Sequence, residues 1–414
     1  MPMNPTRTMA DSHAGFYHSN ELASNSFVGL THGVNPQRPL RRLSARISHA
    51  ILGGVATTPV DGTPPGGVSA PMRIVVARTE ADARLWQDFA DHHQGASNYH
   101  RWGWKRVIEA SFGWPTYYLM AEEGGQTRGI LPLVWQKSRL FGSFLTSLPF
   151  FNAGGVVAED KAAEEALIQE GIKLCQQLQA RHLELRHRHD HSLGLPAKTN
   201  KVAVMMEVGP DKEKMMRTLR HEVRTKIRKA IKLGLTAEVC GAEALNDFYE
   251  VFAHTMRDLG TPVYGRNFFR EILRTFPSDT HIVVVRHQGK AIAVSLMSGF
   301  RDTLETIWGA SLHQYNSMAP NMLMYWKMLC CTLERRYRVF DFGRSTIGSG
   351  PHSFKRQWSS HEIPLHWDYW LASGNNLPEL NPQNPKYRLA IWLWQRLPLA
   401  VTKWIGPRIV KCLP

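Results

Sequence analysis

The sequence is poor in cysteine and has no long apolar run. Its 414 residues include only five cysteines, which are scattered, odd in number and without metal-ligand spacing: Cys175, Cys240, Cys330, Cys331 and Cys412. This excludes a disulfide framework and predicts reduced thiols in a cytoplasm. No stretch approaches the roughly 20 apolar residues of a membrane-spanning helix, and the first residues lack an apolar signal core. We therefore expect a cytoplasmic chain.

Acidic residues are missing from the end of the chain. Residues 382–414 contain six Lys or Arg, three Trp and no acid, in a chain whose formal net charge is +15. Aromatic, apolar and basic residues mixed in this way suit a membrane interface. The tail over 373–414 is thus either a peripheral contact with the inner membrane or a helical segment packed on its own domain, and the sequence leaves both alternatives open.

A second basic segment lies near the middle of the chain. Residues 211–232 hold nine Lys or Arg against three acids. Apolar residues three or four apart predict one helix over 211–233 with a single apolar stripe, formed by Met216, Leu219, Val223, Ile227 and Ile231. Its basic face is either simply solvated or binds the phosphates of tRNA or of anionic lipid.

The rest of the chain reads as two similar halves. Residues 117–135 and 280–300 each show a strand, a glycine turn and a second strand, and each is followed by a helix pattern and a closing strand. This predicts an internal duplication, with an α/β (α+β) fold of two domains over 72–210 and 234–372 that contain mixed sheets and are joined by the basic helix. Residues 1–71, rich in Ser, Gly and Pro, are expected to be a disordered extension; alternatively, the native start is Met72.

One segment carries a specific resemblance. Residues 315–358 contain the helix opening APN, the strand end DFGRS, a GSG loop and the sequence FKRQW. The segment resembles the C-terminal domain of FemAB-like proteins, in the branch associated with exosortase/PEP-CTERM exopolysaccharide systems. The resemblance extends from about Met72 to the end, and it implies two tandem GNAT-like domains. This chain lacks the charged helical arm of some members, and HQYNSMAPN replaces the usual acetyl-CoA loop.

The resemblance also implies an activity. It implies an N-acyltransferase or aminoacyltransferase that uses acyl-CoA or aminoacyl-tRNA as donor substrate, with no permanently bound cofactor, and an amine-bearing envelope or saccharide acceptor. Phe354 and Lys355 match the family's functional pair, so Lys355 is expected to stabilise the oxyanion of acyl transfer from an accessible position. The rival readings are an inactive GNAT-like scaffold at the membrane surface and a nucleic-acid-binding protein.

The other candidate residues are expected to bind substrate or donor. Arg344 follows a strand and suits an anionic donor, although an ion pair of Asp341 with Arg344 or a neighbour explains these residues equally well. The opening of the helix at Asn321 offers free backbone N–H groups. The complete set of expected binding residues is Asp341, Arg344, Tyr315, Asn316, Asn321, Ser349, Gly350 and Trp358.

A run of histidines invites a metal interpretation. The sequence RHRHDHS places His187 and His189 on one face of a strand, followed by Asp190 and His191. Because no Cys or Glu ligand is close in sequence, a solvated loop is the better reading, and no metal is predicted.

Overall fold

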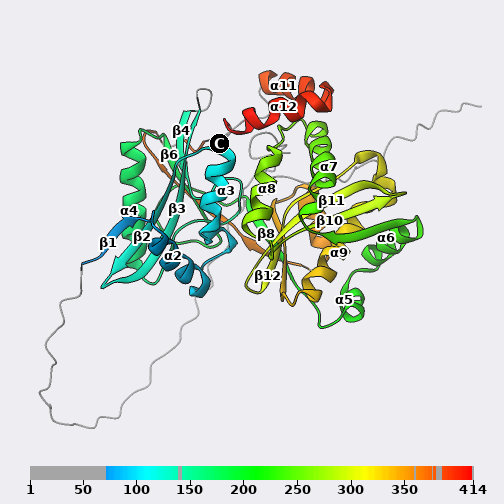
Figure 1. Ribbon diagram of the computed structural model, residues 1–414, viewed down its shortest axis with the longest axis horizontal. Coiled ribbons are helices and arrows are strands. Elements are labelled where there is room, and N and C mark those ends of the chain that lie inside the picture. The colour runs from blue at the N-terminus through cyan, green and yellow to red at the C-terminus, as the bar shows by residue number, and fades with distance from the viewer. Residues whose placement is uncertain (1–70, 139–141, 359, 375, 379–384, 413–414) are drawn as a thin grey trace, which may run out of the picture.

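The computed structural model describes residues 71–138, 142–358, 360–374, 376–378 and 385–412 (Figure 1). Apart from Pro71, the extension expected over residues 1–71 lies outside this part of the chain. Within the described residues, no helix is both long and apolar enough to cross a membrane.

The first half forms a sheet whose first four strands are antiparallel neighbours. β1 (Arg73–Val76), β2 (Thr116–Glu123), β3 (Gln126–Ser138) and β4 (Gly142–Thr146) follow this order, and the short β5 (Val157–Ala158) pairs with β3. Helices α2 (Glu80–His92) and α3 (Gly103–Phe112) lie between β1 and β2 in sequence. Helix α4 (Lys161–Gln177) then leads to β6 (His182–His187), which pairs with β4 in parallel.

Helix α4 shows how the sequence fixes these elements. Asp160 caps it by accepting a hydrogen bond from the N–H of Ala163, in agreement with the acidic start of this segment. Its buried face, which includes Leu167 and Cys175, packs in one core with Leu133 and Leu183 of the sheet. The helix therefore packs on one face of the sheet, against β3 and β6. This packing sets the position of the residues that follow β6.

The second half repeats this order. β9 (Leu235–Cys240), β10 (Thr280–His287), β11 (Lys290–Phe300) and β12 (Thr303–Ser311) are antiparallel neighbours, with α7 (Leu245–Asp258) and α8 (Arg266–Thr275) between β9 and β10. Helix α9 (Pro320–Glu334) leads to β13 (Val339–Thr346), which pairs with β12 in parallel. Two mixed sheets are thus confirmed, and the shared element order agrees with the predicted duplication.

The two halves exchange one strand. β8 (Lys201–Glu207) follows the first half in sequence but joins the second sheet, between β13 and β14 (His361–Pro364). β15 (His366–Leu371) follows the second half but joins the first sheet, between β6 and β7 (Ala197–Lys198). The two sheets therefore do not coincide with the domain boundaries at 210 and 234 that the sequence pattern suggests. The pattern could not reveal this exchange, because hydrophobic alternation does not tell which sheet edge a strand joins.

The single basic helix expected over 211–233 is wrong. The segment forms two helices, α5 (Lys212–Thr218) and α6 (His221–Lys232), separated by extended backbone at Leu219 and Arg220. Ile231 is 54% exposed and Met216 is only partly buried, so neither belongs to the buried stripe. The side chains that are buried are Met215, Leu219, Val223, Ile227 and Ala230.

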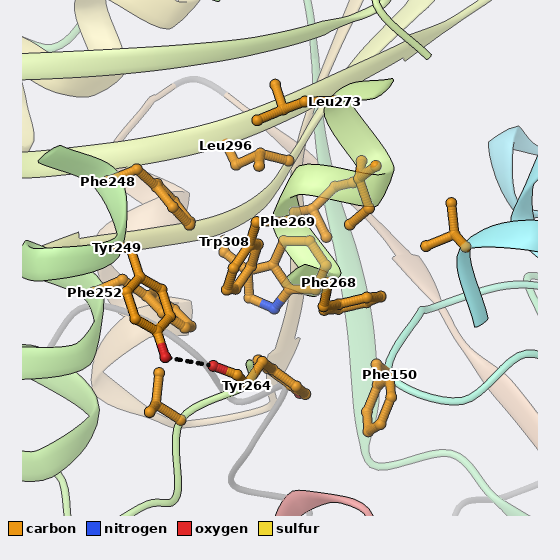
Figure 2. Close-up of a cluster of buried hydrophobic side chains, with 14 of the residues drawn as sticks. Phe150, Phe248, Tyr249, Phe252, Tyr264, Phe268, Phe269, Leu273, Leu296 and Trp308 are labelled. Carbon is orange, nitrogen blue, oxygen red and sulfur yellow. Dashed lines mark hydrogen bonds between the residues drawn. The ribbon is translucent and has the colours of Figure 1, made fainter. Parts of the chain in front are cut away.

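One aromatic core joins the two halves. Helix α3 packs against α8, and Phe150 from the first half meets Tyr264 and Phe268 from the second, with ring centroids 5.0 and 6.0 Å apart. Figure 2 shows Phe268 between Phe150 on one side and Trp308 of β12 on the other. Because these rings are buried together, the halves form one continuous core, and the groups at their interface are held in fixed positions.

Candidate active site

In each sheet the two parallel strands pair only briefly and then separate. β12 and β13 are paired from Thr303–Glu305 to Val339–Asp341, and β4 and β6 only through two residue pairs. Beyond Asp341, β13 stays paired with β8 on its other side, through Arg344–Thr346, but no longer pairs with β12. Ligands of open α/β sheets gather where the carboxyl ends of strands diverge. Each half therefore has one such point.

A pair of buried carboxyl groups occupies this point in the second half. Glu305 and Asp341 are the last cross-strand pair of β12 and β13, and they are 3% and 1% exposed. The Asn152 amide donates to Glu305 over 2.7 Å, and the Arg188 guanidinium donates to Asp341 over 3.3 Å. Gly343 adds a backbone N–H to Asp341 at 2.8 Å. The first half therefore supplies Asn152 and Arg188 to this pair, and the second half supplies Gly343.

Burial changes the acidity of both carboxyl groups. It raises the pKa of Glu305 to about 8, with the neighbouring Asp341 charge as the next cause, and it also raises the pKa of Asp341. Burial raises the pKa of the nearby Tyr99 hydroxyl as well, followed by the effect of Glu305. A carboxyl group whose pKa lies near neutral pH can exchange a proton with a substrate.

Lys355 lies beside this pair, but it is not at the surface. Its side chain is buried, and its Nζ donates to the carbonyl oxygens of Gly343 and Arg344 over 3.1 and 2.7 Å. The expectation of an accessible Lys355 is therefore wrong, because the short helix α10 (Gly350–Lys355) turns its last residue inward against β13. The Lys355 charge acts to lower the pKa of Asp341, against the larger effect of burial.

Arg344 stacks on an aromatic ring, whereas the sequence suggested an ion pair with Asp341. Its guanidinium lies 5.0 Å from the ring of Trp367, and Arg186 of β6 lies 4.4 Å from the same ring. Both also donate to the carbonyl oxygen of Phe151, over 3.5 and 2.9 Å. The partner of Asp341 is Arg188, so the ion pair at Asp341 is formed with a residue of the other half.

Four of the expected site residues pack or cap around α10. Phe354 and Trp358 are buried, with ring centroids 5.3 and 5.8 Å from that of Tyr325. Ser349 caps α10 by accepting the N–H of His352 over 3.3 Å, and Gly350 is the first residue of the helix. These contacts hold Lys355 in place.

The other three lie at the start of α9 or in the turn before it. Tyr315 and Asn316 belong to the helical turn His313–Met318, and Tyr315 contacts His287 of β10. Asn321 in the first turn of α9 donates to Ser311 of β12 over 3.0 Å. The structure thus brings together Asp341, Arg344 and Lys355, whereas Tyr315, Asn316 and Asn321 lie around the start of α9.

A cavity of about 410 Å³ opens at the corresponding point of the first half. It is lined by residues that precede α3, follow β4 and follow β6, among them Ser97, His100, Ala153, Glu164, Arg188 and His191. None of the ten residues expected from the sequence lines it. Because Arg188 lines the cavity and also binds Asp341, this arginine connects the cavity to the carboxyl pair.

Burial lowers the pKa of two histidines that line the cavity, His187 and His100. His187 accepts the Val156 N–H over 3.1 Å at Nε2 and makes a 2.8 Å hydrogen bond to Asp368 at Nδ1. Both ring nitrogens of His100 are also engaged, with Ser97 and Gly155, and burial lowers the pKa of this residue to about 4. Because these ring nitrogens are occupied by hydrogen bonds, they are not available to bind a metal ion. The described part of the chain contains no group of His, Cys, Asp and Glu that could hold a metal ion.

The sequence did not predict Glu305, Asn152 and Arg188 as site residues. Glu305 was nevertheless detectable, because it is the only charged residue in the strand TLETIWGAS. A lone carboxyl group in a strand that is otherwise buried requires a partner or a raised pKa. Asn152 and Arg188 lie in loops of the other half, and their proximity to Glu305 and Asp341 depends on the packing of the halves.

Comparison with known proteins agrees with this architecture. Residues 217–356 match the family described as acetyltransferase (GNAT) domain. The structure is similar to that of FemX, with a TM-score of 0.57 at 14% identity, covering 75% of this chain and 98% of that chain. It is also similar to a tandem GNAT protein from the clavulanic acid biosynthesis pathway, with a TM-score of 0.50 at 10% identity. This match covers 74% of this chain and 100% of that chain. No curated protein matches the chain in sequence.

These similarities establish the fold. Residues 217–356 in the second half match the GNAT domain family, and the two mixed sheets resemble the tandem GNAT fold. The expected fold class is therefore confirmed.

Proposed function

We propose that this chain is an N-acyltransferase or aminoacyltransferase whose proton acceptor is Glu305. The main observation behind this proposal is the buried pair of Glu305 and Asp341, which lies where β12 and β13 diverge. Arg188 connects this pair to the cavity of the first half. The match of residues 217–356 to the GNAT domain family supports acyl transfer as the reaction type.

The reaction requires a proton to leave the acceptor amine. An alkyl ammonium group is not nucleophilic, so it must lose a proton before its nitrogen attacks the acyl carbonyl. The new C–N bond then replaces the C–S bond of an acyl-CoA or the ester C–O bond of an aminoacyl-tRNA. Two protons therefore leave the nitrogen. One passes from the ammonium group to solvent before attack. The ionised Glu305 carboxylate takes the second as the C–N bond forms and then gives it to the departing thiolate or ribose oxygen.

Lys355 is the group we assign to the negative charge of the tetrahedral intermediate. Its two hydrogen bonds to the carbonyls of β13 fix its ammonium group before substrate binds. A cation that is already in position costs no reorganisation when charge develops, which is the basis of oxyanion stabilisation. The resemblance of the Phe354–Lys355 pair to that of FemAB-like proteins supports the assignment.

The donor and acceptor follow from the same resemblance. We propose acyl-CoA or aminoacyl-tRNA as donor, and an amine-bearing saccharide or envelope precursor in a cytoplasmic exosortase/PEP-CTERM-associated pathway as acceptor. The exposed cations in and directly before α6 favour a phosphate-rich donor such as tRNA; they are Arg220, Arg228, Lys229 and Lys232. Asp341, Arg344, Tyr315, Asn316, Asn321, Ser349, Gly350 and Trp358 stay proposed binding or supporting residues.

The test is transfer of a radiolabelled group from acetyl-CoA, or from a mixture of aminoacyl-tRNAs, to amino sugars and UDP-linked amino sugars. Glu305→Gln should reduce turnover by roughly a hundredfold. Because the pKa of Glu305 is raised to about 8, wild-type kcat/KM should increase with pH up to about that value. The exposed Glu222→Gln is the matched control and should act like wild type.

Two results would contradict the proposal. Near-wild-type turnover by a folded Glu305→Gln variant would remove Glu305 from the mechanism. Absence of transfer from both donor classes, together with binding of a saccharide, would instead identify an inactive GNAT-like scaffold.

A further inference from the structure

We propose that the last two helices form a docking surface for an anionic lipid bilayer. These helices are α11 (Pro385–Arg396) and α12 (Leu399–Val410), which lie together beside α7 at one end of the molecule (Figure 1). The inference concerns a surface away from the carboxyl pair, and it does not depend on the proposed acyl transfer.

One face of each helix is fixed to the body of the protein. In α11 the Trp394 side chain is buried, and Gln395 donates to the carbonyl oxygen of Asp258 over 3.0 Å. In α12 Lys403 forms an ion pair with Glu250 of α7, and Val410 is buried. The tail is therefore packed on the second half, which gives its outer face a defined orientation.

The opposite face of α11 is apolar and exposed. Leu389, Trp392 and Leu393 are 59%, 48% and 52% exposed, and their spacing places them on one side of the helix with Arg396. In α12 Trp404 is 65% exposed. Half of the large apolar side chains exposed in the described part of the chain belong to these two helices. Such a concentration marks an interaction surface, unlike single exposed apolar residues.

The charges around this face select the partner. Arg396 lies over the ring of Trp392 at 3.8 Å, and Arg408 lies over that of Trp404 at 4.6 Å. Arg388 and Lys411 are also exposed, and residues 382–414 contain no acid. Tryptophan prefers the headgroup level of a bilayer, and neighbouring cations attract anionic headgroups.

Other occupants fit less well. A second copy of this surface would bring two sets of arginines together without an intervening acid, which is unfavourable. A nucleic acid would find exposed cations on α6 without needing the apolar ridge of Leu389 and Leu393. An anionic bilayer satisfies both the apolar and the cationic groups.

The experiment measures sedimentation of the full chain with vesicles. Mixed phosphatidylglycerol–phosphatidylcholine vesicles should bind the wild type, and pure phosphatidylcholine vesicles should bind it much less. The double substitution Trp392→Ser with Trp404→Ser should lower partitioning at least about tenfold. Arg388→Gln and Lys411→Gln should each lower it about fivefold.

The matched control is the other basic surface. Ile231→Ser with Lys229→Gln removes an exposed apolar group and a cation from α6 and should leave vesicle binding unchanged. Thermal unfolding checks that each variant is folded, as expected for substitutions at exposed positions. The proposal is overturned if the tryptophan variant binds like wild type, or if only the α6 variant loses binding. Concentration-dependent dimers that the tryptophan substitutions dissolve, without any vesicle binding, would assign the surface to a second copy.

Discussion

The last parallel strand pair differs between the two halves, although both halves place it at the same point of the sheet. In the first half it joins Thr146 to Glu184, and in the second half it joins Glu305 to Asp341. Burial acts to raise the pKa of Glu184, but the Arg186 guanidinium, 2.7 Å away, together with His182 and Lys198, outweighs burial and holds the pKa below its usual value. Burial raises the pKa of Glu305 to about 8.

The comparison separates two uses of one topology. In the first half, the ion pair of Glu184 and Arg186 stabilises the sheet beside an open cavity. In the second half, two carboxyl groups share the same position, and one of them titrates near neutral pH. A repeated fold therefore fixes where a functional group lies, whereas the charge of its neighbours decides what that group can do.

The largest expected effect tests the first half. Arg186→Met leaves the buried Glu184 carboxylate without its cation and should cost about 3–5 kcal/mol of unfolding free energy, measured by urea denaturation. Arg188→Met should cost only about 1–3 kcal/mol, because Asp341 has a raised pKa and can take up a proton. Equal losses of unfolding free energy in the two variants would show that Glu184 and Asp341 depend equally on their arginines, and would contradict the proposed difference between the halves.

The next effect concerns Lys355 in the second half. Lys355→Met should reduce turnover by roughly a hundredfold, because the charge assigned to the oxyanion is removed. It should also cost about 1–3 kcal/mol of stability, since two buried carbonyls lose their donor. The exposed Lys173→Met on α4 serves as control and should change neither quantity. Rapid turnover by folded Lys355→Met would show that this lysine only supports the structure.

The smallest effect is measured over a single pH unit, and it sharpens the comparison through proton binding. Between about 4.5 and 8, Glu305 binds a proton in the folded state but not in the unfolded state, so its contribution to stability is lost as pH rises. Wild type relative to Glu305→Gln should therefore lose up to about 1.4 kcal/mol per pH unit across this window. Glu184 has a lowered pKa, so its contribution is present above about 4.5 and is lost as pH falls below that value.

Urea denaturation at a series of pH values measures both differences. The free-energy difference between wild type and Glu305→Gln should decrease with rising pH, and that for Glu184→Gln should decrease with falling pH. Slopes of the same sign would mean that the two glutamates have similar environments in the folded protein.

Local patterns in the sequence were sufficient for the elements of both halves. The hairpin of β10 and β11 and the Pro320 start of α9 appear as the sequence indicates. The exchange of β8 and β15 was not predictable, because alternation fixes a strand and its buried face but not its neighbour. The break at Leu219 likewise followed from packing rather than from the spacing of apolar residues.

The candidate site was predictable only where its residues are neighbours in sequence. Asp341, Arg344 and Lys355 lie within one short segment, and the structure keeps them together. Their partners Arg188 and Asn152 come from the first half and meet them only after the halves pack. Burial of Lys355 was missed because a lysine is rarely buried unless its ammonium group finds acceptors, which here are backbone carbonyls.

The strand exchange also sets an order of events during synthesis. β6 leaves the ribosome long before β15, which ends about 180 residues later in the chain. At the usual rate of translation this interval lasts roughly 10 to 40 seconds. Throughout it, the edge of β6 that β15 will cover exposes unpaired backbone groups and is open to pairing with another nascent chain. Completion of the first sheet is thus among the last steps of folding, and cells that make this protein rapidly must protect that edge until residue 371 has emerged.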